Sequence, residues 1–428
     1  MEVHPNPRRE FLKTTALIGS MALWPGDAYG LFSGTAENPL PPAGAGKSII
    51  GAYGTWAAGL VNQPPALSLR KDRWKSIGSW KAEALTKALE LMAPPEIART
   101  PSVTTVKAYT YNGLDVEELT WQLPYGNRTE AVLLKPRGAS GRLPGVLGLH
   151  DHGGNKYFGA RKITRTSDQQ HPMMSTHQER YYEGRAWANE LAKRGYVVLV
   201  PDSFAFASRR ILFSDMADIP WGHASTKGLS DTDPEAQDHI DAYNRWAAEH
   251  EHILSKALFC AGTTWPGVFF SEDKAALDVL AARNDVDSGR LGCAGLSGGG
   301  LRSVYLGGLD DRVKCAISVG FMTTWTDFLL NKAYTHTWMT YTPLMPKFLE
   351  FPEILGLRAP LPAMTMNNNQ DELFDLTEMQ KADRILTQVF SRAGAPEKYQ
   401  GRFYDGPHKF DAAMQEDAFN WFDRWLRA

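Results

Sequence analysis

The sequence predicts an α/β fold, with a mostly parallel central sheet, antiparallel N-terminal strands, helices on both faces and an aromatic insertion near the C-terminal strand ends. Three patterns support this prediction. Short apolar runs alternate with helix-like segments from residue 145 onward, which is typical of a parallel sheet with crossover helices. Alternating residues around Asn112-Gly113 indicate a hairpin of antiparallel strands. An apolar run at 290–294 passes almost directly into a helical pattern at 301–309.

Length and composition are those of a globular protein. The 428 residues are 43% hydrophobic and 22% charged, which is enough apolar material for a large core. The net charge of −2 gives no electrostatic footprint for nucleic acid. No apolar run reaches the roughly 18 residues that predict a spanning helix. We predict a single domain over 56–428, although the length alone would allow two or three.

The first 30 residues resemble a twin-arginine export signal. The run Arg8-Arg9-Glu10-Phe11-Leu12-Lys13 precedes a modest apolar stretch, 16–24, that is too short for a stable anchor. A basic amphipathic N-terminus is the alternative interpretation. We therefore expect a signal peptide at 1–30, a linker rich in Gly, Pro and Ala at 31–55, and a periplasmic or secreted protein without a membrane anchor once the signal is removed.

The N-terminal part of the domain combines one helix with four strands. Apolar residues at helical spacing predict a helix over 72–92 within a helical extension at 56–100, and Pro94-Pro95 ends that helix. The pattern then changes to strand-like runs, which are 104–111, 116–123, 128–135 and 145–149.

Helices and buried strands alternate in the rest of the chain, with two interruptions. A polar, irregular excursion is expected at 203–235, and an aromatic insertion at 321–358 is a candidate lid or pocket wall, because it would lie over the strand ends where ligands bind. The predicted helices are 178–194, 239–259, 272–283, 301–309, 381–392 and 410–426. The predicted strands are 196–200, 290–294, 313–319, 361–366 and 399–404.

A candidate nucleophile lies where the strand at 290–294 turns into the following helix. The turn is Gly295-Leu296-Ser297-Gly298-Gly299. A sharp strand-to-helix corner strains its central residue, and flanking glycines let the backbones approach without Cβ clashes. Such a corner would hold Ser297 above the sheet, as in a nucleophile elbow. An ordinary glycine turn is the alternative.

Serine needs a base, and the base needs a group that fixes its tautomer. Two polar loops follow later strands on the same edge of the predicted sheet, and they carry Asp371 and His408. We predict that His408 is the base and that Asp371 orients it, in the chain order Ser, acid, His. Competing acids are Glu372, Asp375 and Asp327.

The oxyanion of the reaction also needs donors. The run His150-Asp151-His152-Gly153-Gly154 follows a buried strand, where a second donor is expected beside the backbone N–H of Gly298. We expect that donor from His152 or Gly153. The two histidines flanking Asp151 could instead converge on a metal, but a third ligand at suitable spacing is not evident. Three cysteines (Cys260, Cys293 and Cys315) show no ligand spacing either, so we predict no metal site.

From residue 145 to the C-terminus the sequence resembles the α/β-hydrolase superfamily, and more narrowly its exported branch related to acetyl xylan esterases and dienelactone hydrolases. This resemblance implies ester hydrolysis through an acyl-enzyme without a cofactor. Two positions depart from the pattern: Asp151 stands where many relatives have glycine, and Ser297 replaces the cysteine nucleophile of the dienelactone hydrolases. The resemblance is carried by 149–154, 194–202, Gly295 to Gly299, Asp371 and His408.

The sequence thus predicts an exported serine carboxylic-ester hydrolase. Its expected partner is a small-molecule or carbohydrate ester, such as an acetylated xylan, and tryptophan faces suited to sugar stacking are candidates for contacting it: Trp325, Trp338 and Trp265. Two alternatives stay open. One is a serine peptidase or amidase of the same fold, and the other is a binding protein that has kept the fold without catalysis.

Overall fold

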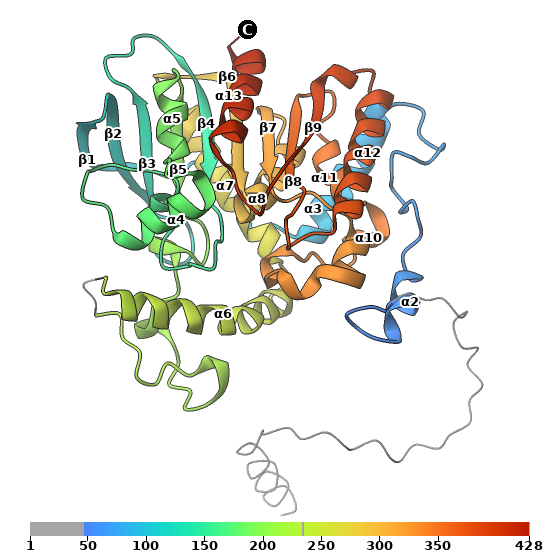
Figure 1. The fold of residues 1–428 in the computed structure, drawn as a ribbon, viewed down its shortest axis with the longest axis horizontal. Coiled ribbons are helices and arrows are strands. Elements are labelled where there is room, and N and C mark those ends of the chain that lie inside the picture. The colour runs from blue at the N-terminus through green and yellow to red at the C-terminus, as the bar shows by residue number, and fades with distance from the viewer. Residues whose placement is uncertain (1–46, 233–234, 428) are drawn as a thin grey trace, which may run out of the picture. The chain divides into compact units, whose positions relative to one another are not determined.

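A mixed β-sheet of nine strands runs through the part of the chain that the computed structural model describes, residues 47–232 and 235–427 (Figure 1). The strand order is β1-β2-β3-β5-β4-β6-β7-β8-β9. The strands are β1 (Thr104–Tyr111), β2 (Leu114–Trp121), β3 (Thr129–Pro136), β4 (Leu143–Leu149), β5 (Val197–Pro201), β6 (Val286–Leu296), β7 (Val313–Val319), β8 (Ala363–Asn368) and β9 (Tyr399–Tyr404).

The sheet changes from antiparallel to parallel at β5. Strands β1, β2 and β3 pair antiparallel, and β3 also pairs antiparallel with β5. From β5 to β9 every pairing is parallel, with Leu147 of β4 opposite Leu199 of β5 and Cys293 of β6. The predicted fold class is therefore confirmed. The carboxyl ends of β4, β6, β7, β8 and β9 share one edge, where loops from distant parts of the sequence meet.

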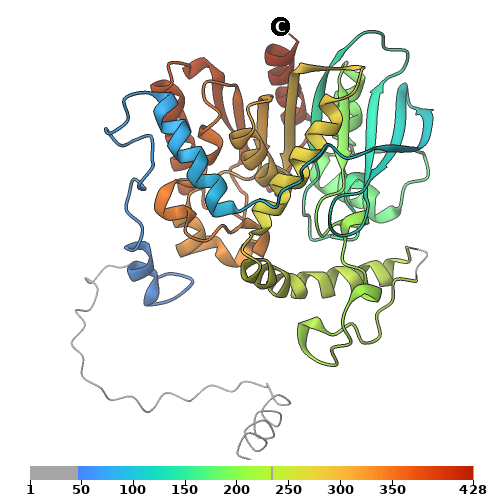
Figure 2. The ribbon, with the colours of Figure 1, turned by 180° about the vertical axis from the view of Figure 1, so that it is seen from behind.

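Helices cover both faces of the sheet. One face carries α4 (Pro172–Tyr182), α5 (Trp187–Lys193) and α13 (Ala412–Leu426) (Figure 1). The other carries α3 (Ile77–Met92), α7 (Trp265–Ala281), α8 (Gly298–Leu309), α11 (Phe351–Gly356) and α12 (Leu376–Arg392) (Figure 2). Helix α6 (Gln237–Cys260) lies across one end of the sheet in both views. Shorter helices are α2 (Tyr53–Ala58), α9 (Trp325–Asp327) and α10 (Met345–Phe348).

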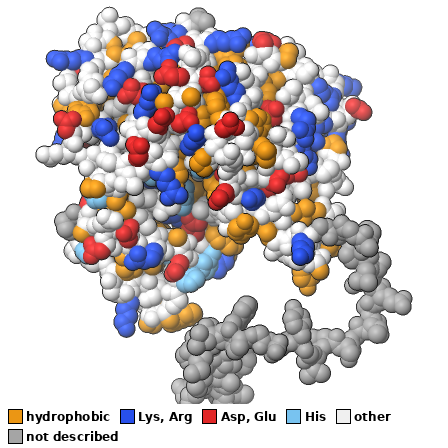
Figure 3. Space-filling model, viewed as in Figure 1, with side chains coloured by type: hydrophobic (Ala, Val, Ile, Leu, Met, Phe, Trp, Pro, Cys, Tyr) orange, Lys and Arg blue, Asp and Glu red, His pale blue; other side chains and the backbone are white. Residues whose placement is uncertain are grey.

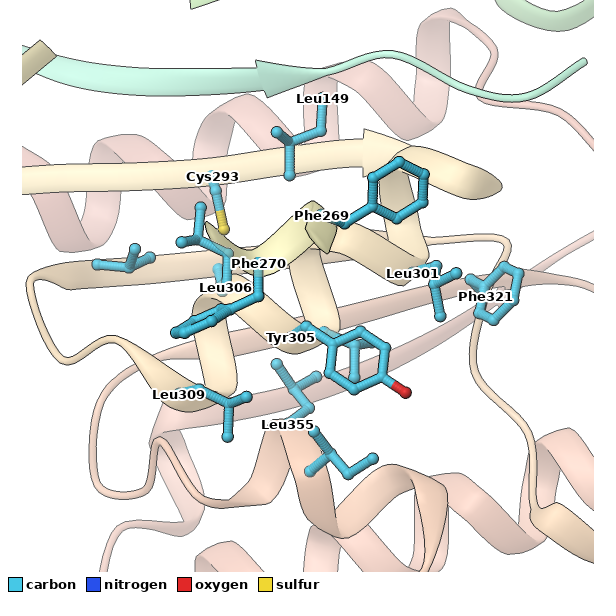
Figure 4. Close-up of a cluster of buried hydrophobic side chains, with 14 of the residues drawn as sticks. Leu149, Phe269, Phe270, Cys293, Leu301, Tyr305, Leu306, Leu309, Phe321 and Leu355 are labelled. Carbon is cyan, nitrogen blue, oxygen red and sulfur yellow. The ribbon is translucent and has the colours of Figure 1, made fainter. Parts of the chain in front are cut away.

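Helix α8 packs at the centre of the larger hydrophobic core. All of its residues are buried, and its apolar side chains lie between the strands and helices α7 and α11 (Figure 4). A Cβ on Gly308 would lie 2.1 Å from the backbone oxygen of Ile354, so glycine is required for α11 to approach this closely. Because α8 is fixed on all sides, the residue that precedes it has a well-defined position.

Several helices differ from their predicted bounds, and two of these differences have a clear local reason. The single helix predicted at 178–194 is two helices, because Glu183 and Gly184 have φ angles of 55° and 72° and end α4 in the left-handed region. Helix α7 begins before residue 272, because the Thr264 hydroxyl accepts a hydrogen bond from the Gly267 N–H at 3.0 Å and Pro266 lies in the first turn.

The predicted signal peptide at 1–30 lies outside the described residues, as does the linker up to residue 46. Helix α2 begins within the last residues of the predicted linker, 47–55. The described residues, 47–232 and 235–427, belong to one compact unit. Among the described helices, none combines the length and the apolar character needed to cross a bilayer.

Acidic and basic side chains are mixed over the face shown in Figure 3, without a large patch of one sign.

Candidate active site

The strand-to-helix corner predicted around Ser297 is present between β6 and α8. Ser297 has φ 57° and ψ −119°, a strained conformation for a residue with a side chain, and its N–H donates to the Val319 oxygen at 2.8 Å. Both flanking glycines are sterically required. A Cβ on Gly295 or Gly299 would lie 2.3 Å or 2.0 Å from the backbone oxygen of Leu149. The corner therefore holds Ser297 at the carboxyl end of the sheet.

Asp371 and His408 form a hydrogen-bonded pair at the same edge of the sheet. Asp371 follows β8 and is 4% exposed, and its Oδ2 lies 2.6 Å from Nδ1 of His408, which follows β9. The second carboxylate oxygen, Oδ1, accepts from the Leu373 N–H at 3.0 Å. Because an ionised carboxylate only accepts hydrogen bonds, the His408 proton lies on Nδ1 and Nε2 carries the lone pair.

The His408 ring borders the cavity that contains Ser297. Its Nε2 is buried and has no hydrogen-bond partner within the described residues. His408 and Ser297 both line a cavity of about 300 Å³. A Cβ on Gly320 would lie 2.8 Å from Cε1 of His408, so the glycine after β7 makes room for the ring. Serine, histidine and aspartate thus come from the ends of three parallel strands.

The three competing acids have other roles. The Asp327 carboxylate accepts from the Thr323 hydroxyl at 2.7 Å and from the Asp375 N–H at 3.1 Å, and burial raises its pKa. Asp375 caps helix α12 by accepting from two backbone N–H groups. Glu372 is exposed. Asp371 is the carboxylate that contacts His408.

The backbone nitrogen of His152 lies close to Gly298, the residue that follows Ser297. A Cβ placed on Gly298 would lie 3.1 Å from that nitrogen. Gly298 is also the first residue of α8, whose N-terminal dipole favours a negative charge. Gly153 lines the same cavity and has φ 52°. His152, whose nitrogen lies next to Gly298, and Gly153 both stay predicted oxyanion donors.

A buried lysine holds the loop that carries the His152 amide. Lys162 Nζ donates to the backbone oxygens of Asp151 and His152, at 2.8 Å each. Burial lowers the pKa of Lys162 to about 8. These two bonds fix the carbonyl orientations of the loop, and therefore the direction of its N–H groups.

The side chain of Asp151, the position that departs from the family pattern, is bonded to residues of helix α4. Its Oδ2 accepts from the Tyr182 hydroxyl at 2.5 Å and from His177 Nε2 at 3.1 Å. Burial raises the pKa of Asp151, but the neighbouring His177 and Lys162 outweigh that effect and hold it well below its usual range. Asp151 therefore anchors the loop to helix α4.

The two histidines of this loop, His150 and His152, bond to different partners. His152 Nε2 lies 3.1 Å from Glu251 Oε1, which also pairs with Lys156 at 2.6 Å, whereas His150 Nε2 lies 3.1 Å from the Ser203 hydroxyl. Within the described ranges, no group of three or more His, Cys, Asp or Glu is placed to hold a metal ion.

Comparison with known proteins agrees with this architecture. Residues 261–347, which include Ser297 but neither Asp371 nor His408, match the model of the prolyl oligopeptidase family. The curated “Putative hydrolase YtaP” of Bacillus subtilis (strain 168) is 24% identical over 81% of this chain and 100% of its own length.

Two solved structures show the fold. A “putative acetyl xylan esterase” from Bacteroides fragilis NCTC 9343 superposes with a TM-score of 0.62 at 16% identity, covering 85% of this chain and 84% of that one. The chain has the α/β-hydrolase fold. A glucuronoyl esterase from Solibacter usitatus also resembles it, with a TM-score of 0.56 at 15% identity over 84% of this chain and 97% of that one.

The tryptophans predicted to contact substrate have different positions in this fold. Trp265 and Trp325 are buried in the hydrophobic core and are not among the residues that line the cavity. Trp338 is 42% exposed and does not line the cavity, although its chain neighbours Thr337 and Met339 do. The positions of Trp265 and Trp325 are explained by packing in the apolar core and not by stacking on a sugar.

Sequence reasoning missed His336, which comes from the insertion at 321–358 and lines the cavity. Its ring packs against Phe328 and Phe374, with centroids 4.8 Å and 4.7 Å away. Burial lowers the pKa of His336 to about 4, so the imidazole is neutral at pH 7. The signal in the sequence was that His336 lies in the aromatic insertion, and this did not distinguish it from the other residues there.

The buried imidazole predicts a specific pH dependence of stability. Between about pH 6.5 and pH 4 the unfolded chain protonates this histidine while the folded chain does not, so lower pH favours unfolding. His336 should account for a loss of about 3 kcal/mol in unfolding free energy on going from neutral pH to pH 4. Urea unfolding of the wild type and of His336→Asn at both pH values measures it. Equal pH dependence in the two proteins would contradict the burial of a neutral imidazole.

Proposed function

We propose that this protein hydrolyses carboxylic esters through a covalent acyl-enzyme on Ser297. The observation that carries the proposal is the Asp371–His408 pair, because His408 lines the same cavity as Ser297 and its Nε2 has no partner among the described residues. A serine on a strained corner beside an oriented histidine is the arrangement that activates a hydroxyl for attack. A binding protein without catalysis would have no need for this combination.

In the acylation step, the Ser297 hydroxyl attacks the ester carbonyl and its proton passes to His408 Nε2. The negative charge that develops on the carbonyl oxygen lies between the N–H groups of His152 and Gly298. Loss of one such donor typically costs ~3 kcal/mol of transition-state stabilisation. Asp371 accepts the hydrogen bond from Nδ1–H and stabilises the imidazolium that forms. His408 then protonates the departing alcohol.

Deacylation repeats these steps with water as the nucleophile. His408 Nε2 takes a proton from water, the resulting hydroxide attacks the acyl-enzyme, and the same two amides bind the oxyanion. Ser297 recovers its proton from His408 when the acid leaves. The chain's own residues supply every proton transfer in this scheme.

The proposed substrate is an ester with a small acyl group on a carbohydrate. The cavity of about 300 Å³ is at the lower end of ligand sites, and its lining joins apolar side chains such as Phe321 and Met339 with the hydroxyls of Thr335 and Thr337. Structural neighbours named as acetyl xylan and glucuronoyl esterases support this class. The twin-arginine-like sequence at 8–13 supports export, which would bring the enzyme to extracellular polysaccharides.

Peptide or amide hydrolysis is the second candidate, because the prolyl oligopeptidase family model matches residues 261–347. The two functions differ in the leaving group. We expect rapid turnover of p-nitrophenyl acetate and little or no turnover of the matched amide, p-nitroacetanilide, or of peptide p-nitroanilides. Acetylated xylo-oligosaccharides should release acetate. Peptide p-nitroanilide hydrolysis that exceeds ester hydrolysis in kcat/KM would assign the protein to the peptidases instead.

A further inference from the structure

A second cavity of about 460 Å³ adjoins the catalytic one. The two share Gly153, Gly154 and Tyr181 as lining residues. Beyond these residues the second cavity runs as a groove between α4 and α6, lined on one side by Thr176 and Arg180 and on the other by Asn244 and Arg245. A ligand that occupies the catalytic cavity can therefore continue into this groove.

The groove lies on the side of the leaving alcohol. In the proposed reaction His408 protonates that alcohol, so the alcohol must lie beside the His408 ring. Tyr181 contacts the same ring edge-on, with centroids 6.4 Å apart, and lines both cavities. The path from His408 past Tyr181 leads into the groove, whereas His336 and Met339 line the other cavity only.

Most polar groups of the groove are hydrogen-bond donors. Asn244 Oδ1 already accepts from the N–H groups of Lys156 and Tyr157, at 2.8 Å and 3.0 Å, so its NH₂ group is what remains for a ligand. The guanidinium of Arg180 lies over the Tyr181 ring, 5.0 Å from its centroid.

The two arginines of the groove are not neutralised within the described part of the chain. No acidic side chain there is within ion-pair distance of Arg180 or Arg245, and Asp241 is the one carboxylate that lines the groove. The groove therefore carries a net positive charge next to the reacting centre. Guanidinium groups bind carboxylates through paired N–H donors, which makes a carboxylate the ligand that matches this lining.

We propose that the groove binds the alcohol part of the substrate and that Arg180 and Arg245 bind a carboxylate on it. The preferred substrates are then acyl esters of hydroxy acids, including sugar acids. This inference rests on the proposed esterase function. It adds that the alcohol part of the preferred substrate carries a negative charge. A groove that only accommodates neutral sugars would use Asp241 and Asn244 and would show no preference for an acid.

The test compares acetate esters that differ only in charge. The probes are the acetates of 4-hydroxybenzoic acid and 4-hydroxybenzamide, and of 4-hydroxyphenylacetic acid and its amide, which place the charge at two distances. The proteins are the wild type, Arg180→Gln, Arg245→Gln and the double variant. Arg384→Gln on α12, an exposed arginine that does not line the groove, is the matched control. All five proteins are also assayed with p-nitrophenyl acetate.

The wild type should prefer at least one acid over its amide by about tenfold or more in kcat/KM, as charge-assisted hydrogen bonds imply. The double variant should lose this preference mainly through KM, while its turnover of p-nitrophenyl acetate stays within about twofold of wild type. The preference should also weaken at high salt. Equal use of acid and amide by the wild type, or a preference that survives the double substitution, would overturn the inference but leave the esterase proposal intact. Failure to hydrolyse p-nitrophenyl acetate at all would overturn both.

Discussion

Replacing Ser297 with alanine should lower kcat/KM for p-nitrophenyl acetate by roughly 10⁴- to 10⁶-fold. The variant loses the atom that forms the acyl-enzyme, and nothing else within the cavity takes its place: His408 would have only water to activate. The residual rate should exceed that of the uncatalysed reaction, because the His152 and Gly298 amides can still bind the oxyanion. Steady-state kinetics at saturating and subsaturating ester measure the loss.

The fold should survive this substitution. Alanine meets the same backbone strain at φ 57° as serine, and α8 stays buried against its neighbours. Ser303→Ala is the matched control, because it removes a buried hydroxyl from the same helix, where Ser303 donates to the Gly299 oxygen at 2.9 Å. This control should keep activity within about tenfold, and thermal melting should show both variants folded. Retention of wild-type activity by Ser297→Ala would show that another group is the nucleophile.

Asp371→Asn should lower kcat by about 10⁴-fold. The asparagine side chain can present its NH₂ group to His408, which reverses the tautomer and places the proton on Nε2. The ring could then no longer accept the Ser297 proton. The change in volume is negligible, so KM and thermal stability should change little compared with kcat.

Asp327→Asn serves as the matched control for the acid. Asp327 is as buried as Asp371 but bonds to Thr323 and Asp375 and not to His408. Its substitution should affect stability more than turnover, with kcat within about tenfold of wild type. The opposite result, a large loss in Asp327→Asn and a small one in Asp371→Asn, would assign the acid to the loop after β7.

The elements that depend on local pattern were the most predictable. Strands β1, β7 and β9 have the predicted bounds, because each is a short apolar or alternating run between clear turn signals. The break between α4 and α5 was overlooked, although Glu183 and the glycine that follows it, Gly184, both adopt a left-handed conformation there. The earlier start of α7 depends on a Thr264 cap and a proline in the first turn, which the search for apolar spacing overlooked.

At the candidate active site too, residues related by a simple pattern were predicted, and residues brought together by packing were not. Asp371 and His408 could be placed together from the sequence, because both follow parallel strands that end at one edge. Lys162, His177 and Tyr182 contact the loop at 150–154 from segments that no short pattern relates to it. For the tryptophans, the sequence identified the kind of side chain but not the environment of the ring. Residue type indicated a large apolar surface, but only the packing decides whether a ring faces the core, as Trp265 does, or the solvent.

Covalent labelling tests the central claim most directly. A fluorophosphonate reacts with an activated serine and leaves a stable phosphonyl adduct, which needs the nucleophile, the base and the oxyanion donors together. We expect the wild type to gain the mass of one phosphonyl group, located on Ser297 by peptide mass spectrometry, with loss of ester turnover in proportion to labelling. His408→Ala should label far more slowly, and Ser297→Ala should not label. A wild-type protein that stays unlabelled, or that is labelled at a residue other than Ser297, would contradict the proposed mechanism.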